Sequence, residues 1–291
     1  MTSSFDDLYC QLRGRPDNAD TAHWEGLHET GRTLIREANA AGDGDAANKA
    51  WHLALVSLAR AEMCRLFEKM RGNDYRAAWP LLEQVEKMVQ ALQTNSILGD
   101  DFAIAELGTM ISRWQSLYPY TVFASPEMII RRQECTICGE VVSPLSPCGH
   151  LPGKVYSGEI CSRKITDCEV ISIALVRDPV QKYSVLIPKE DPHDYMQVRF
   201  AVERVSGPFT PWMIQKCTAL HDHSLFGGWN REDHCPCHSG NRYSDCCAKL
   251  SGVRMPHIQF LFTEPISGEQ PALVVRKREN ANGKFEDVVV A

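Results

Sequence analysis

The chain has 291 residues, 44% of them hydrophobic and 23% charged, a composition that is typical of a folded globular protein and excludes a disordered one. Its formal net charge of −6 arises in residues 1–130, where 18 acidic residues face 12 basic ones, whereas residues 131–291 carry 19 of each. Because nonspecific nucleic-acid binding needs a concentrated field of Lys and Arg, this balance argues against nucleic acid as the main ligand and leaves only a local basic patch for it.

Neither a membrane span nor a signal peptide is predicted. The sequence has no apolar run of about 18 residues, and its first residues lack a basic segment followed by an apolar one. We therefore expect a cytoplasmic protein. Cytoplasmic thiols stay reduced, so the grouping of many of the 12 cysteines indicates metal binding and not disulfide formation.

Residues 1–130 are predicted to form a bundle of four or five helices. Apolar side chains recur at three- and four-residue spacings, and Gly, Asp and Asn residues interrupt the pattern. Short connections between such segments favour antiparallel neighbours. The Met and Trp residues on these stripes are expected to pack in the core and not to form a cofactor site. The predicted helices span residues 21–41, 45–70, 74–92 and 100–117.

Apolar and polar residues alternate in the second half of the chain, as they do in strands. Val170–Val176 and Tyr183–Ile187 are predicted to be adjacent strands joined by a turn that contains Pro179. Gln197–Val205 is predicted to be a third strand or else a helix.

The C-terminal residues predict a β-hairpin, because Ala272–Arg276 and Phe285–Val290 flank the turn dipeptide Asn282-Gly283. The overall class is therefore α+β. Three domains are expected: a helical bundle at 1–130, a zinc knuckle with a small β domain at 131–225, and a second zinc module with the hairpin at 226–291.

Cys135 and Cys138 form one half of a zinc knuckle. Two intervening residues let both thiolates reach one ion, and the glycine that follows gives the backbone freedom to turn. A tetrahedral ion needs two more ligands, which we expect to be Cys148 and either His150 or Cys161, with His150 preferred. We expect a structural site, because no helical His-Glu pair lies nearby to supply the general base of a hydrolytic zinc site.

A second cluster combines a Cys-x-Cys pair with a Cys-Cys pair after eight intervening residues, which places four thiolates on a very short loop. About residues 230–250 resemble the SEC-C zinc-binding motif, which is named for the C-terminal tail of the translocase ATPase SecA and is appended to many bacterial proteins. The resemblance implies that the ligands are Cys235, Cys237, Cys246 and Cys247.

The resemblance also implies a docking function, since in SecA the motif is implicated in binding a partner protein and membrane lipid. His238 stands where the motif commonly has Gly. Arg242 and Tyr243 match its basic and aromatic positions, and together with Lys249 they are expected to be exposed contacts for an acidic protein surface or for phosphate.

These patterns together predict a non-catalytic zinc protein that holds two structural Zn²⁺ ions and docks a protein partner or nucleic acid. The alternative is a metal-dependent hydrolase or nuclease that uses the surplus ligands of residues 148–161, or His221 and His223. The cysteines outside the two clusters are expected to be small buried apolar residues. They are Cys10, Cys64, Cys168 and Cys217.

Overall fold

The computed structural model describes residues 4–17, 19–187, 193–262, 273–278 and 285–290. The chain divides into two compact units. The first comprises Met1–Val202 with Ser206–Phe209, and the second comprises Glu203–Val205 with Thr210–Ala291. Helices dominate the first unit and antiparallel strands the second, so the predicted α+β class is confirmed.

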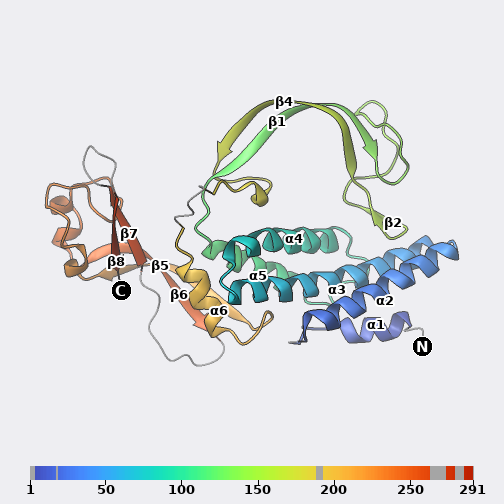
Figure 1. Ribbon diagram of the computed structural model, residues 1–291, viewed down its shortest axis with the longest axis horizontal. Coiled ribbons are helices and arrows are strands. Elements are labelled where there is room, and N and C mark those ends of the chain that lie inside the picture. The colour runs from blue at the N-terminus through green and yellow to red at the C-terminus, as the bar shows by residue number, and fades with distance from the viewer. Residues whose placement is uncertain (1–3, 18, 188–192, 263–272, 279–284, 291) are drawn as a thin grey trace. The chain divides into compact units, whose positions relative to one another are not determined.

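Five helices form the core of the first unit (Figure 1). The predicted bundle is therefore confirmed, and so is the placing of its Met and Trp stripe in the core, where Trp51, Met63 and Trp79 are buried. The longest helix, α3, is buried around most of its circumference because its neighbours cover it from several sides. No helix in the part of the chain that the structure describes combines the length and the apolar character needed to cross a bilayer. The five helices are α1 (Phe5–Leu12), α2 (Thr21–Ala40), α3 (Gly44–Arg71), α4 (Tyr75–Thr94) and α5 (Ile104–Leu117).

Local sequence explains where these helices begin and how closely they pack. Asp20, Asp43 and Asp74 each accept a hydrogen bond from a backbone N–H three residues later, which caps α2, α3 and α4. Gly31 lets α2 approach α3, since a Cβ at this position would lie 2.7 Å from Cβ of Ala54.

A long two-stranded ribbon leaves the bundle after α5. Strand β1 (Phe123–Cys135) pairs antiparallel with β4 (Arg163–Val176), with bulges along the way. The predicted strand at 170–176 is therefore confirmed, but its partner is β1.

The predicted strand Tyr183–Ile187 is wrong. Residues Lys182–Ser184 form the short 3₁₀ helix η1, and Val185 makes only an isolated bridge to Phe123. The reason lies in the bundle, which holds this segment in place. The indole N–H of Trp79 donates to the carbonyl of Lys182 at 2.9 Å, and the Lys182 ammonium lies 2.6 Å from a carboxylate oxygen of Glu86.

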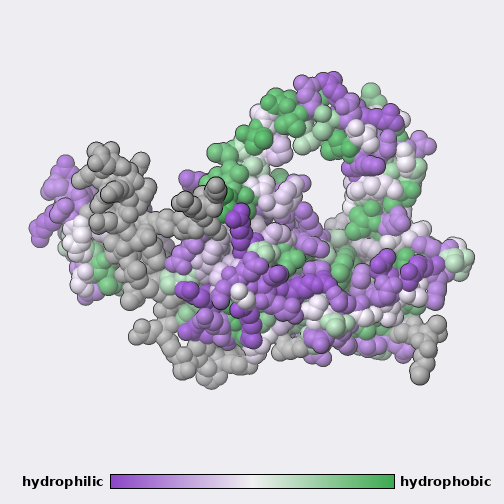
Figure 2. Space-filling model, viewed as in Figure 1, coloured by the Kyte–Doolittle hydropathy of each residue, from purple (hydrophilic) through white to green (hydrophobic). Residues whose placement is uncertain are grey.

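The loop that joins β1 to β4 returns to the bundle and packs on it. It contains the small hairpin of β2 (Val155–Tyr156) and β3 (Glu159–Ile160). Hydrogen bonds join this hairpin to side chains of Asn39, Asn48 and Asn95. The ribbon is thus attached to the bundle at both ends, and Figure 2 shows an opening beneath it.

Helix α6 (Met196–Arg204) occupies the segment for which strand and helix were both predicted, so the helical alternative is correct. In the second unit, β5 (Trp212–His221) pairs antiparallel with β6 (Val253–Phe262), and the second cysteine cluster lies between them in sequence. The predicted C-terminal hairpin is confirmed as well: β7 (Leu273–Arg278) pairs with β8 (Phe285–Val290), although its turn at Asn282-Gly283 lies outside the described residues.

Candidate metal centres

The first cluster lies where β1 ends and the loop begins. Cys135 is the last residue of β1, and the N–H of Gly139 donates to its carbonyl at 2.8 Å, which closes a tight turn around Cys138. Cys148 and His150 come from the following loop. The ligand atoms of these two and of Cys135 and Cys138 all lie within 4.8 Å of one another, so the group could hold a metal ion.

Cys161 lies beside this group as a fifth donor. Its sulfur is 3.8 Å from that of Cys135, which matches the edge of about 3.8 Å for a tetrahedron of thiolates about 2.3 Å from a metal. His150 also fits a ligand role. Its Nδ1 is buried and has no hydrogen-bond partner among the described residues, a costly state that coordination to a metal would relieve. The structure thus brings together all five residues that the sequence singled out.

Arg163, which no sequence pattern indicated, lies against the same cluster. Its guanidinium donates to the sulfur of Cys161 at 3.4 Å and to the carbonyl of His150 at 2.6 Å. A positive charge at this position offsets the negative charge that three or four thiolates concentrate in one place. The pairing of Cys135 with Arg163 across β1 and β4 puts the arginine there, a register that the sequence alone does not reveal.

Cys135 is prepared for deprotonation by its surroundings. Burial acts to raise the pKa of this thiol, but backbone N–H groups of Cys138 and Ile137 and the neighbouring thiols outweigh it and lower the pKa to about 6. A thiolate is the form that binds metal ions, so this residue is ready to bind at neutral pH.

The second cluster lies on a compact loop between β5 and β6. The N–H of Cys235 donates to the carbonyl of Asn241 at 2.7 Å, which folds the first Cys pair toward the second. The sulfurs of Cys237 and Cys246 are 3.5 Å apart, and those of Cys246 and Cys247 are 3.9 Å apart, again close to a tetrahedral edge. All four ligand atoms lie within 4.8 Å of one another, so this group too could hold a metal ion.

Hydrogen bonds support the thiolate form in this cluster as well. Burial acts to raise the pKa of Cys237, but hydrogen bonds from Ser239 and Cys235 outweigh it and lower the pKa to about 6. Burial raises the pKa of Cys247 to about 12, although the backbone N–H of Arg254 points at its sulfur from 3.4 Å. The four cysteines are therefore unequal, and binding a metal would displace the protons that remain.

One residue of the second cluster's loop has a strained backbone. His238 has a φ of 59°, in the left-handed region where glycine is favoured. A glycine at this position would adopt this conformation without strain.

No known protein family, characterised protein or solved structure matches this chain. The function proposed below therefore rests on the two clusters and the residues around them.

His223 organises the second cluster from outside it. Its Nδ1 is hydrogen-bonded to the hydroxyl of Tyr243 at 2.6 Å and its Nε2 to the carbonyl of Leu250 at 2.9 Å, so both ring nitrogens are engaged. The expectation of an exposed Tyr243 is therefore wrong, since its ring packs against Cys235 and Cys247 in the core of the module.

Two of the three expected partner contacts are exposed. Arg242 forms an ion pair with Glu232 at 2.7 Å, and Lys249 forms one with Asp245 at 3.1 Å. Such exposed pairs contribute little to stability and can exchange their partners readily.

The cysteines outside the clusters divide into two kinds. Cys64 is buried, as expected. The expectation for Cys10, Cys168 and Cys217 is wrong, because all three are exposed. Cys168 lies on β4 and Cys217 on β5, each in a two-stranded sheet. Among the described residues, nothing packs over these two positions closely enough to bury the thiols.

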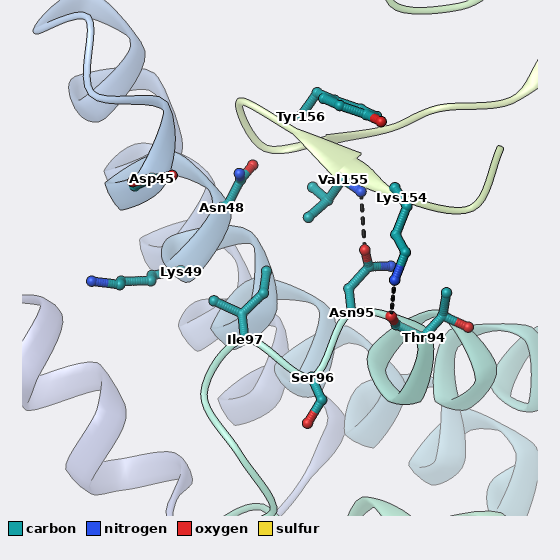
Figure 3. A pocket seen from close by; sticks show the side chains of 10 residues that line it. All are labelled: Asp45, Asn48, Lys49, Thr94, Asn95, Ser96, Ile97, Lys154, Val155 and Tyr156. Carbon is teal, nitrogen blue, oxygen red and sulfur yellow. Dashed lines mark hydrogen bonds between the residues drawn. The ribbon is translucent and has the colours of Figure 1, made fainter. Parts of the chain in front are cut away.

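A polar cleft of about 410 Å³ separates the first metal cluster's loop from the helices (Figure 3). Two hydrogen bonds cross it: the N–H of Val155 donates to Oδ1 of Asn95 at 3.0 Å, and Nζ of Lys154 donates to the carbonyl of Thr94 at 2.7 Å. The cleft is thus the seam along which the loop docks on the bundle.

Proposed function

We propose that this chain is a docking protein in which each cysteine cluster holds one structural Zn²⁺ ion. The convergence of each cluster's donor atoms to within 4.8 Å supports this proposal most strongly. Thiolate-rich tetrahedral sites are typical of structural zinc, whose four protein ligands leave no position for a reacting water.

The local chemistry supports a structural role for the metal. Neither cluster includes a carboxylate among the described residues, and both nitrogens of His223 are engaged in hydrogen bonds. A hydrolase or nuclease would need a general base and an open coordination position. The non-catalytic function is therefore the one that the geometry favours.

The second module is proposed to be a SEC-C-like docking surface for a protein partner. The strained backbone at His238, where the motif commonly has Gly, agrees with the resemblance. Arg242 and Lys249 project from the module as exposed cations, which suits an acidic surface on the partner. Tyr243 supports the module from within and is not one of the proposed contacts.

Metal content per chain, measured by plasma mass spectrometry together with a thiol count, tests the metal assignment. We expect two zinc ions in the unmodified chain and one in Cys148→Ser or Cys246→Ser. Cys217→Ser is the matched control, since it removes an exposed thiol outside both clusters and should leave two ions bound. A different metal, or an unchanged content in both ligand variants, would refute the assignment.

Local folding and partner capture test the docking function. Because structural zinc contributes folding free energy directly, Cys246→Ser should abolish amide protection in residues 234–250 and preserve it in the first unit. The paired change Arg242→Glu with Lys249→Glu should lose a protein that the unmodified chain and the exposed-surface control Arg131→Glu both capture. Equal capture by all three would contradict the proposed surface.

A further inference from the structure

One face of the β1–β4 ribbon is apolar along most of its length. Residues paired across two strands lie on the same face, and alternate residues along a strand do so too. The register gathers four cross-strand pairs on one face, because the shift between Glu127 and Met128 leaves Ile171 as an extra residue on β4 and keeps the following pairs on the same side. We name this the apolar ribbon face. Its pairs are Ala124 with Leu175, Pro126 with Ile173, Met128 with Val170, and Ile130 with Cys168.

The opposite face of the ribbon is mixed, since the exposed Ile129 lies there but is paired with Glu169. There Ser125 faces Ala174 and Glu127 faces Ser172, whose hydroxyl donates to the Glu127 carboxylate at 2.9 Å. The opposite face therefore carries two acidic side chains, Glu127 and Glu169, whereas the four pairs of the apolar ribbon face include no charged side chain. Figure 2 shows hydrophobic residues gathered along this part of the chain.

The apolar ribbon face is exposed in the single chain. The exposed fractions of its large side chains are 37% for Met128, 46% for Ile130, 57% for Val170, 65% for Ile173 and 69% for Leu175. Monomeric proteins seldom leave a contiguous apolar patch of this kind in water. A two-stranded ribbon is also marginally stable unless something packs against it.

The area of this face fits an interface between two proteins. The five exposed fractions together correspond to roughly 500 Å² of apolar surface, close to the apolar share of a standard interface that buries about 800 Å² per partner. Across its four pairs the face presents no charged side chain, so two copies can meet without burying an unpaired charge. Two identical apolar faces can pack on each other about a two-fold axis, which is the commonest symmetry of protein dimers.

We propose that the apolar ribbon face is the interface of a homodimer, in which two ribbons pack face to face. The occupant of the face is therefore a second copy of this chain. This inference does not depend on the identity of the metal or on the docking function of the second module.

Sedimentation velocity on the full-length, metal-loaded chain tests the proposal. We expect the unmodified 32.7 kDa chain to sediment as a dimer at micromolar concentration. The paired change Ile173→Lys with Leu175→Lys should produce a monomer. Ala174→Lys is the matched control, because Ala174 is exposed between these two residues but lies on the opposite face, and it should leave the dimer intact.

Thiol labelling of the unmodified chain provides a second measurement that needs no variant. Cys168 belongs to the apolar ribbon face, whereas Cys10 is exposed on α1. Labelling of Cys168 should be at least tenfold slower than that of Cys10 at dimer-forming concentration, and the two rates should approach each other on dilution. A monomeric unmodified chain, a dimer that survives both lysine substitutions, or equal labelling at every concentration would each overturn the proposal.

Discussion

Asn95 is the residue that most directly fixes the first metal cluster's loop to the helical bundle. Its side-chain amide donates to the carbonyl of Gly153 at 2.7 Å and accepts from the N–H of Val155 at 3.0 Å, and Asn95 itself is only 6% exposed. Asn95→Ala removes both hydrogen bonds. Gly153 and Val155 are half-buried, so water can replace part of what is lost, and each bond then contributes about 1 kcal/mol.

The expected result is a loss of about 2 kcal/mol from the free energy of undocking the β2–β3 hairpin. Since about 1.4 kcal/mol corresponds to a factor of ten, the undocked population should rise by roughly 30-fold. Hydrogen exchange measures this population. The best reporter is the N–H of Gly158, which donates to Oδ1 of Asn48 at 2.9 Å. Its hydrogen bond does not involve Asn95, so its exchange rate reports undocking of the whole hairpin.

Thr94→Ala is the matched control, because Thr94 is exposed and, among the described residues, its hydrogen bond to the loop is made by its backbone carbonyl, which accepts from Nζ of Lys154. Exchange at Gly158 should accelerate in Asn95→Ala and stay unchanged in Thr94→Ala. If exchange at Val155 accelerates but that at Gly158 does not, the hairpin does not undock as a unit and the reasoning is refuted.

Three further predictions concern single histidines and their neighbours. His150→Ala should lose one metal ion per chain, whereas Cys161→Ser should keep both, because the ligand atom of His150 lies with those of Cys135, Cys138 and Cys148. Metal analysis that shows the reverse would make Cys161 the ligand. His238→Gly should stabilise the second module by about 0.5–1 kcal/mol, because glycine adopts the left-handed backbone of this position without strain. Chelator competition should then show tighter metal binding, and unchanged or weaker binding would contradict the prediction. Burial lowers the pKa of His52 from its ordinary 6.5, so the unfolded chain takes up a proton first and stability falls as the pH drops below about 6.5. Denaturant unfolding at pH 7.5 and 5.5 should show that the free energy of unfolding falls less in His52→Asn than in the unmodified chain. An equal fall in both would exclude His52 as the source of the pH dependence.

Helices α2 to α5 could be predicted because their signals are local, whereas the short helix α1 was not predicted. Asp20, Asp43 and Asp74 cap their own helices, and the apolar stripes repeat within each segment. The β1–β4 pairing could not be predicted in the same way, since its partners lie about 30 to 50 residues apart and the closer Tyr183–Ile187 segment offered a similar apolar pattern. Trp79 packs against Phe123 at the start of β1 and donates a hydrogen bond to the carbonyl of Lys182, just before the Tyr183–Ile187 segment. These contacts favour β1 as the partner of β4, and they form only in the folded bundle.

The metal clusters show the same division between local and long-range information. Cysteine spacing predicted both groups, because residues this close in sequence can hardly avoid one another. Arg163 was not predicted, and His223 was considered only as a residue of the alternative enzymatic site, since register and tertiary packing bring both to the clusters. Tyr243 and Cys168 were assigned the wrong exposure for a related reason: burial depends on the layer that covers a residue, which neither motif nor hydropathy specifies.

The ribbon's attachment at both ends also affects how it meets any other molecule. A hairpin held only at its base would swing about that base, and binding would have to arrest this motion at an entropic cost. Here η1 and α4 hold one end, while Asn48 and Asn95 hold the other. We therefore expect the ribbon to keep one orientation relative to the helical bundle before another molecule binds to it. Weakening the far attachment should slow association even where every contact surface is unchanged.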